Sequence, residues 1–256
     1  MPSDQVQSLQ RAFLLLSCLE TAGRPLSLQE LSARSGLPKS TVHRLLSTLG
    51  AEDFIEQSNL DGHYRLGLRL LELGSAASNA RSIINIAKPY MQRIVYEINE
   101  SVCLALLSRG EVLILEFIES SSAFHVVSRV GARLPAHCTV QGKIMLAFKP
   151  ASEVRQILRK HGMRAYTPNT LCTYEQLTPE LEQIRRQGYA LDNSEFHVGL
   201  YSIAAPIYDA AGNVEYSFAV VSMFHKIASA EFAHAKALVL EAASAISRAL
   251  GYRGDD

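Results

Sequence analysis

The stretch GLPKSTVHRLLSTLG, residues 36–50, restricts the fold of this 256-residue chain more than any other segment. Gly36-Leu37-Pro38 is a tight turn that no helix continues through. Before it, Ser27 and Glu30 have the capping-box spacing that begins a helix. After it, apolar residues at i, i+3, i+4 and i+7 predict a second helix with one buried stripe: Val42, Leu45, Leu46 and Leu49. The segment therefore predicts two short helices joined by a tight turn.

The neighbouring segments extend this pattern. Residues 5–22 have apolar residues at helical spacing, and FIEQSNLDGHYRLG, residues 54–67, predicts two short strands joined by a turn at Asp61-Gly62. Helix, helix, tight turn, helix and hairpin follow in the order of a winged helix-turn-helix. In that motif the second helix of the pair enters the major groove of DNA. We therefore predict a DNA-binding domain over residues 1–67.

Polar side chains at the start of that second helix are the candidates for DNA contact. They can donate to phosphates or base edges, and Arg44 can bind guanine through two hydrogen bonds. Two hairpin residues are further candidates for the DNA backbone or minor groove. The set is Lys39, Ser40, Thr41, His43, Arg44, His63 and Arg65. However, residues 1–67 contain six Lys or Arg and seven Asp or Glu, which is not the basic balance usual for such a domain. A winged helix that binds another protein therefore remains an alternative.

Composition limits the other possibilities. The formal net charge is zero and 48% of residues are hydrophobic, so any nucleic-acid site must be a local patch on a globular protein. The apolar runs VCLALL and VLILEFI are too short to span a bilayer, and we see no signal peptide. The cysteines form no CxxC pair, which favours reduced thiols over a zinc site: Cys18, Cys103, Cys138 and Cys172. We expect a cytoplasmic protein with no metal, no cofactor and no membrane partner.

The composition changes after residue 67. LRLLELGSAASNARS, residues 68–82, predicts a linker helix, and residues 83–256 predict strands with hairpin turns interspersed with helices. That pattern is typical of an α+β domain with a mostly antiparallel sheet. Leu68, Leu71 and Ser75 form a candidate dimer surface, although a helix packed on its own domain would have the same pattern.

The stretch GARLPAHCTVQGKIMLA, residues 131–147, predicts a loop that enters a helix near Val140. A phosphate-binding P-loop requires Gly at position 137 and Ser or Thr at 144, where this chain has His137 and Ile144. An enzyme would have to use Cys138, His137 and Asp192, but adjacent residues rarely point at each other and no orienting group is evident. We therefore predict no catalytic residue, with a small-molecule-processing enzyme as an alternative.

This same stretch resembles a signature of the IclR family of bacterial transcriptional regulators. The matching residues are Gly131, Leu134, Pro135, His137, Thr139, Gly142, Lys143, Leu146 and Ala147. LDNSEFHVGLYSIAAPIYDAAGN, residues 191–213, is similar to the second signature, and the helix-turn-helix segment is similar to the family's. The resemblance implies a winged helix-turn-helix, a linker helix and a GAF-like domain that binds a small effector. It also implies a homodimer or homotetramer that binds an operator in double-stranded DNA, often of catabolic genes.

The resemblance further implies where an effector binds. Backbone amides at the helix start near Val140 would face a carboxylate, and Asp192 matches the family's pocket aspartate. The candidate effector-binding residues are Val140, Gln141, Gly142, Met145, Asp192, Ser202, Ala219 and Val221. Ala219 and Val221 replace residues that are often Ser in sensors of small acids. We therefore expect an apolar pocket floor, with Phe218, Met145 and Met223 nearby, and an aromatic or bulkier organic acid as effector. Strand alternation puts 219 and 221 on one face without saying which, so both could instead belong to the core.

Overall fold

The computed structural model describes residues 6–79, 82–121, 128–222 and 229–254. The chain forms two compact units, Met1–Ala80 and Arg81–Asp256. In the described ranges, no helix is both long enough and apolar enough to cross a membrane.

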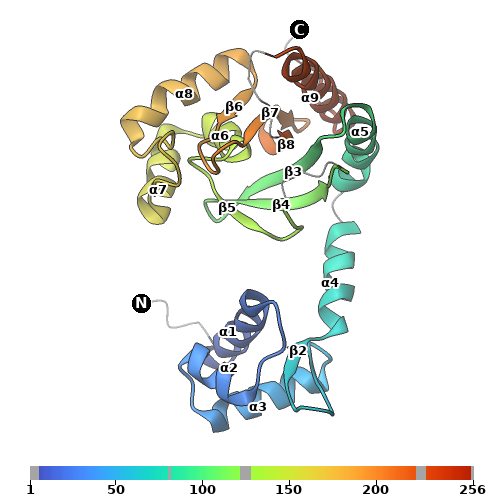
Figure 1. Ribbon diagram of the computed structural model, residues 1–256, viewed down its shortest axis with the longest axis vertical. Helices are drawn as coiled ribbons and strands as arrows, with labels where there is room; N and C mark the ends of the chain where they lie inside the picture. Colours follow the sequence, from blue (N-terminus) through green and yellow to red (C-terminus); the bar gives the residue numbers. More distant parts are fainter. Residues whose placement is uncertain (1–5, 80–81, 122–127, 223–228, 255–256) are drawn as a thin grey trace. The chain divides into compact units, whose positions relative to one another are not determined.

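The N-terminal unit is a winged helix-turn-helix (Figure 1). It consists of α1 (Gln7–Ala22), α2 (Leu28–Ser35), α3 (Lys39–Ala51), the strands β1 (Ile55–Gln57) and β2 (Tyr64–Leu66), and α4 (Leu68–Asn79). The strands pair antiparallel, and Leu26 bridges to Tyr64. Apolar side chains from α1, α2, α3, the hairpin and the segment before α2 meet in one core: Leu15, Leu19, Leu26, Leu31, Val42, Leu46, Ile55 and Tyr64.

Local chemistry sets the helix boundaries of this unit. The capping box of α2 is present, because the Glu30 amide donates to Ser27 Oγ and the Ser27 amide donates to Glu30 Oε2. Glu30 also pairs with Arg24, and these contacts lower its pKa to about 2. Gly36 ends α2 in the left-handed conformation at φ 68°. Pro38 occupies the cap position of α3, so Ser40 lies inside the helix and does not cap it.

The C-terminal unit is built on one six-stranded antiparallel sheet of order β5-β4-β3-β8-β7-β6. Its strands are β3 (Ser101–Ser108), β4 (Glu111–Ile118), β5 (Arg133–Pro135), β6 (Ala190–Asn193), β7 (Tyr201–Tyr208) and β8 (Val214–Ser222). Its helices are α5 (Ser82–Ile98), α6 (Val140–Ala147), α7 (Ala151–His161), α8 (Tyr174–Gln187) and α9 (Ala230–Ala249). The expected α+β class is confirmed.

Helices cover both faces of this sheet (Figure 1). On one face, α5 and α9 pack around a core that includes Met91, Ile203, Phe218 and Val220. On the other face, α6 packs against the central strands, and α8 packs against α6. Because β8 alternates, Ala219 and Val221 lie on the α6 face while Phe218 lies on the opposite one.

Two short strands were not expected. β5 lies in what was predicted as a loop, and β6 lies in the acidic segment after α8. Each has three or four residues at a sheet edge and pairs with one neighbour, so neither has an alternating run that periodicity detects. The sequence also predicts a strand at residues 124–130, and most of these lie outside the described residues.

Candidate DNA-binding and effector sites

The start of α3 presents an exposed polar edge. Lys39, Ser40, His43 and Arg44 are exposed and Thr41 is half-buried, while Val42 and Leu46 on the other side are buried in the core. Within the described ranges, no carboxylate forms an ion pair with Lys39 or Arg44. Among the described residues no side chain caps the first turn of α3, so its amides are free to donate hydrogen bonds to a phosphate oxygen. The helix therefore packs on one side and offers donors on the other.

The two hairpin candidates have intramolecular partners. Arg65 donates from Nε and Nη2 to Glu56 Oε2 at 2.8 and 2.6 Å. His63 Nδ1 lies 3.3 Å from Asp61 Oδ2. At the hairpin tip, Leu60 is fully exposed. To contact DNA, Arg65 would have to leave or share its carboxylate, which the α3 residues need not do.

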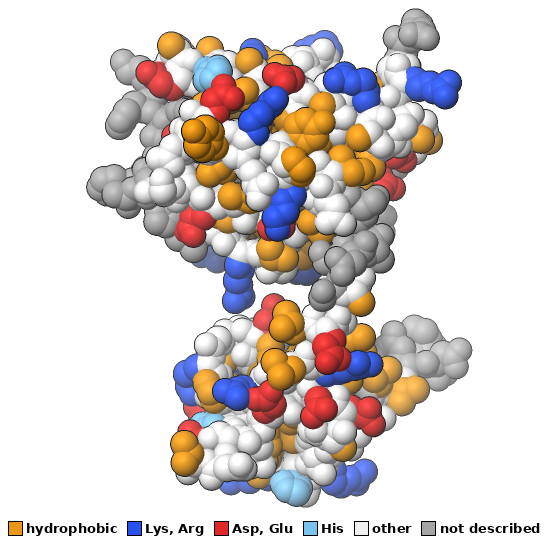
Figure 2. Space-filling view, turned by 90° about the vertical axis from the view of Figure 1, so that its right-hand side faces the viewer, with side chains coloured by type: hydrophobic (Ala, Val, Ile, Leu, Met, Phe, Trp, Pro, Cys, Tyr) orange, Lys and Arg blue, Asp and Glu red, His pale blue; other side chains and the backbone are white. Residues whose placement is uncertain are grey.

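Figure 2 shows one side of the N-terminal unit, where basic, acidic and apolar side chains alternate without a continuous basic surface. This agrees with the composition of residues 1–67. Positive charge on the unit is therefore local, and the unpaired side chains at the start of α3 supply part of it.

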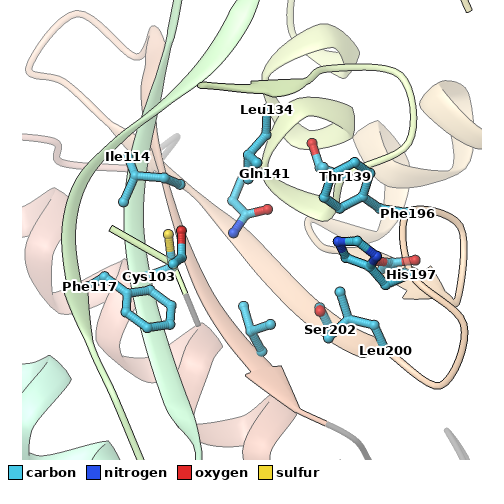
Figure 3. A pocket seen from close by; sticks show the side chains of 13 residues that line it. Cys103, Ile114, Phe117, Leu134, Thr139, Gln141, Phe196, His197, Leu200 and Ser202 are labelled. Carbon is cyan, nitrogen blue, oxygen red and sulfur yellow. The ribbon is translucent and has the colours of Figure 1, made fainter. Parts of the chain in front are cut away.

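The C-terminal unit contains a small pocket of about 80 Å³ on the α6 face of the sheet. All six strands contribute to its wall, together with the start of α6 and the segment that follows β6. Figure 3 shows the side chains that surround it. They are Cys103, Ile114, Phe117, Ser128, Leu134, Thr139, Gln141, Asp192, Phe196, His197, Leu200, Ser202 and Val221. Seven of these thirteen side chains are apolar, and the polar ones are Ser128, Thr139, Gln141, Asp192, His197 and Ser202.

Four of the eight predicted effector residues line this pocket: Gln141, Asp192, Ser202 and Val221. The other four, Val140, Gly142, Met145 and Ala219, are buried in the structure but do not line it. Gly142 has a steric role, since a Cβ there would lie 2.3 Å from the Ala136 carbonyl oxygen. Val140, Met145 and Ala219 belong to the core between α6 and the sheet.

The expected floor of the pocket needs correction. Phe218 points to the opposite face of the sheet and packs in the core of α5 and α9. It lies three residues before Val221, and residues an odd number apart in a strand lie on opposite faces. Met145 is buried among core residues under α6. Met223 lies outside the described residues. The apolar groups that line the pocket come instead from elsewhere, notably Phe117, Ile114 and Leu200.

Sequence reasoning missed most of the aromatic wall. Phe117 and Ile114 are ordinary strand residues, and nothing in their local pattern distinguishes pocket from core. Phe196 and His197 do lie within the second family-like segment, so their position next to Asp192 was the available signal. Their rings are 4.3 Å apart, centroid to centroid.

Asp192 is the buried acidic group of the pocket, with 2% of its surface exposed. Its Oδ1 accepts a hydrogen bond from the Glu195 amide at 2.8 Å. Burial nevertheless dominates and raises the pKa of Asp192 to about 7. Near neutral pH this carboxyl is therefore partly protonated, and its protonated form can donate a hydrogen bond to a bound acid.

Behind Asp192 lies a buried ion-pair network centred on Lys143. The Lys143 ammonium is fully buried and donates to Glu195 Oε1, to Glu180 Oε1 at 3.1 Å and to the Leu191 carbonyl oxygen at 2.6 Å. Glu195 Oε2 finds no hydrogen-bond partner among the described residues. The network ties α6 to α8 and to the strand that contains Asp192, so it holds the pocket aspartate in place.

The residues considered for an enzyme do not form a catalytic group. Burial raises the pKa of the Cys138 thiol to about 12, so no thiolate forms near neutral pH. His137 Nε2 donates to the Arg164 carbonyl oxygen at 3.0 Å, and burial lowers the pKa of this histidine. Among the described residues, no group of three or more His, Cys, Asp or Glu is placed to hold a metal ion.

A winged helix-turn-helix and a pocketed α+β domain on one chain define the class of ligand-responsive transcriptional regulators. Comparison with known families identifies the group. The family "IclR helix-turn-helix domain" matches residues 8–59, and "Bacterial transcriptional regulator IclR C-terminal" matches residues 75–248. The protein belongs to the IclR family of bacterial transcriptional regulators, whose members bind DNA and a small-molecule effector, and it is not an enzyme.

Individual relatives agree over nearly the whole chain. The HTH-type transcriptional regulator XynR of Escherichia coli K12 is 33% identical, over 96% of this chain and 98% of that protein. The HTH-type transcriptional repressor AllR of Salmonella paratyphi A is 34% identical, over 96% and 91%. An IclR homologue from Microbacterium hydrocarbonoxydans, crystallised with 4-hydroxybenzoate, superposes with a TM-score of 0.85 at 28% identity, over 95% and 99%.

Proposed function

We propose that this protein controls catabolic genes in response to an organic acid that binds the pocket between α6 and the sheet, with an aromatic acid favoured. The observation that supports this most directly is the composition of the pocket wall. Phe117, Phe196 and Leu200 suit the apolar body of such a ligand, while Gln141 and Asp192 suit its polar group. That a solved homologue was crystallised with 4-hydroxybenzoate fits the same chemistry.

The size of the pocket suggests how binding would be sensed. A cavity of about 150 Å³ is known to hold benzene, whereas this one measures about 80 Å³. An aromatic acid would therefore enter only if part of the wall moved. The segment with Phe196 and His197 is the candidate to move, because it lies outside the strands and helices, between β6 and β7. A ligand that binds the widened state more tightly shifts the population toward it.

For DNA we propose the same division of roles that the sequence predicted. Lys39, Ser40, Thr41, His43 and Arg44 would read the major groove from the start of α3. His63 and Arg65 would contact the DNA backbone from the hairpin. Residues 1–67 would form the DNA-binding domain, residues 68–82 the linker helix and residues 83–256 the effector-binding domain.

A homo-oligomer completes the proposal. Two linked DNA-binding domains bind two half-sites of an operator more tightly than a single domain binds one half-site. An effector can then change DNA affinity by changing the spacing between the two domains. On α4, Leu68 and Leu71 expose 65% and 70% of their surface, which fits a helix that pairs with a second copy. The side chain of Ser75, the third predicted member of that surface, lies outside the described part.

The test combines DNA binding with an effector screen. Fluorescence anisotropy of the full chain on DNA from its own upstream region, against a scrambled duplex, would show specific binding. We expect 4-hydroxybenzoate or benzoate to change that signal at lower concentration than pyruvate or glyoxylate. A change of the anisotropy signal at low concentrations of pyruvate or glyoxylate, with no change from the aromatic acids, would contradict the aromatic preference.

Two matched variants make the screen sharper. Val221 lines the pocket and Ala219 does not, although both lie on the same face of β8. Val221→Ser should weaken the response to aromatic acids because it removes apolar contact area. Ala219→Ser should leave their relative ranking unchanged. Equal effects of the two substitutions would show that the ligand does not bind against Val221.

A further inference from the structure

A second cavity in the C-terminal unit shares no residue with the proposed effector pocket. It measures about 210 Å³ and lies beside the edge strand β5, between the β3–β4 turn, α7 and the segment that follows α7. Its polar wall contains Arg133, His137, His161, Arg164 and Glu111, and Ile157 adds an apolar surface.

The charge of this cavity is positive. Its wall has two arginines against one carboxylate, and that carboxylate, Glu111, lies 3.7 Å from Arg133. Arg133 is further held by the Ser108 carbonyl oxygen at 2.9 Å. By contrast, no carboxylate of the described residues forms an ion pair with Arg164, whose guanidinium lies 5.6 Å from the centre of the Tyr166 ring. Arg164 therefore retains free donors at the rim.

The backbone of Arg164 is held in place by a hydrogen bond. Its carbonyl oxygen accepts a hydrogen bond from Nε2 of the buried His137 at 3.0 Å. His161 packs over the β3–β4 turn so closely that a Cβ on Gly110 would lie 2.7 Å from its Nε2. The backbone that presents the cationic groups is thus anchored to the segment between β5 and α6 and packed against the β3–β4 turn before any ligand arrives, which reduces the entropic cost of binding.

We propose that this cavity is a second ligand site, for a small dianion with carboxylate or phosphate oxygens. Arg164 is the principal anion-binding residue, because a guanidinium donates two parallel hydrogen bonds to such oxygens. Arg133 and His161 line the same cavity and supply further donors. Ile157 offers an apolar surface that a short carbon chain of the ligand would contact.

The two cavities have a common aromatic wall. Tyr166 belongs to the second cavity, and its ring contacts Phe196 edge to face with centroids 5.0 Å apart. Phe196 belongs to the first pocket. A ligand that immobilises Arg164 and Tyr166 therefore restrains the same segment that an aromatic effector would have to move. This consequence rests on the proposed effector function, whereas the anion site itself does not.

Calorimetric titration of the full chain tests the site without any effector. The probes are sodium phosphate and sodium succinate, each at constant ionic strength maintained with chloride. The probe whose binding saturates shows whether the site takes phosphate or carboxylate oxygens. Arg164→Gln should weaken binding of the saturating probe about tenfold or more. Arg186→Gln, an equal charge change on the exposed side of α8, and Gln141→Leu, in the first pocket, should change it less than about twofold.

Three outcomes would overturn the proposal: no saturable binding of either probe to the wild-type protein, equal binding by Arg164→Gln and wild type, or loss of binding in Gln141→Leu. Thermal melting of each variant shows that it is folded, which we expect because Arg164 is exposed. If the probes bind as expected while aromatic acids have no effect on DNA binding, the effector proposal fails and the anion site stands.

Discussion

Lys143 Nζ lies 2.5 Å from Oε1 of Glu195, and neither side chain is more than 8% exposed. The pair joins α6 to the segment after β6, which carries the pocket residue Phe196 and directly follows the strand that carries Asp192. Such a pair costs desolvation, so its value to stability is small, but removing one partner leaves a buried charge without compensation.

Lys143→Met should therefore destabilise the C-terminal unit by about 3–5 kcal/mol, as is typical when one member of a buried pair is lost. The double variant Lys143→Met with Glu195→Gln removes the orphaned charge and should recover part of that loss. Urea unfolding followed by circular dichroism measures both. A single variant as stable as the wild type would show that the ion pair does not hold this part of the fold.

Arg44→Ala should weaken operator binding by about 1–3 kcal/mol and relax preference at the base it contacts. Its side chain is exposed and has no carboxylate partner within the described ranges, so stability should be unchanged. Anisotropy titrations at several salt concentrations would measure affinity. Arg186→Ala, the same charge change on α8, is the control. If the two substitutions reduce affinity equally, Arg44 acts through general charge and makes no specific contact.

Glu56→Gln should strengthen binding to any duplex. Glu56 Oε2 now accepts both hydrogen bonds from Arg65, so the substitution releases a cation on the hairpin and removes an anion near it. We expect the slope of log affinity against log salt to steepen by about one, as for one added phosphate contact. The hairpin would have no part in DNA contact if the slope stayed the same.

The Asp192 carboxyl predicts a pH dependence of stability. Its folded-state pKa, about 7, lies above its ordinary value of 3.8. Between about pH 4 and pH 7 the folded state therefore holds a proton that the unfolded state has lost, and stability falls as the pH rises through that window.

Asp192→Asn should remove this dependence while keeping an oxygen that accepts from the Glu195 amide. The variant should be more stable than the wild type at pH 8, by roughly 2–4 kcal/mol for a shift of this size, and equal to it near pH 3.5. Thermal melts across this range provide the comparison. A variant that is less stable than the wild type at pH 8 would mean that ionised Asp192 is stabilised by its surroundings.

The amino-acid sequence by itself determined the winged helix-turn-helix. The capping box at Ser27 and Glu30, the Gly36–Pro38 turn and the stripe of Val42 and Leu46 are local patterns, with partners within a few residues of each other. Family resemblance added the pocket aspartate and Gln141. For the features of the helix-turn-helix local spacing is sufficient, because backbone geometry alone decides which side chains share a face.

Tertiary structure decided the rest of the effector pocket. Alternation in β8 put Ala219 and Val221 on one face, but only the packing of α6 showed which face, and it turned Phe218 away. Phe117 and Phe196 come from segments far apart in sequence and reach one cavity through sheet pairing. The partners of Lys143 are likewise 37 and 52 residues away. Contacts of that range depend on the assembled sheet and the helices packed on it, so no local pattern contains them.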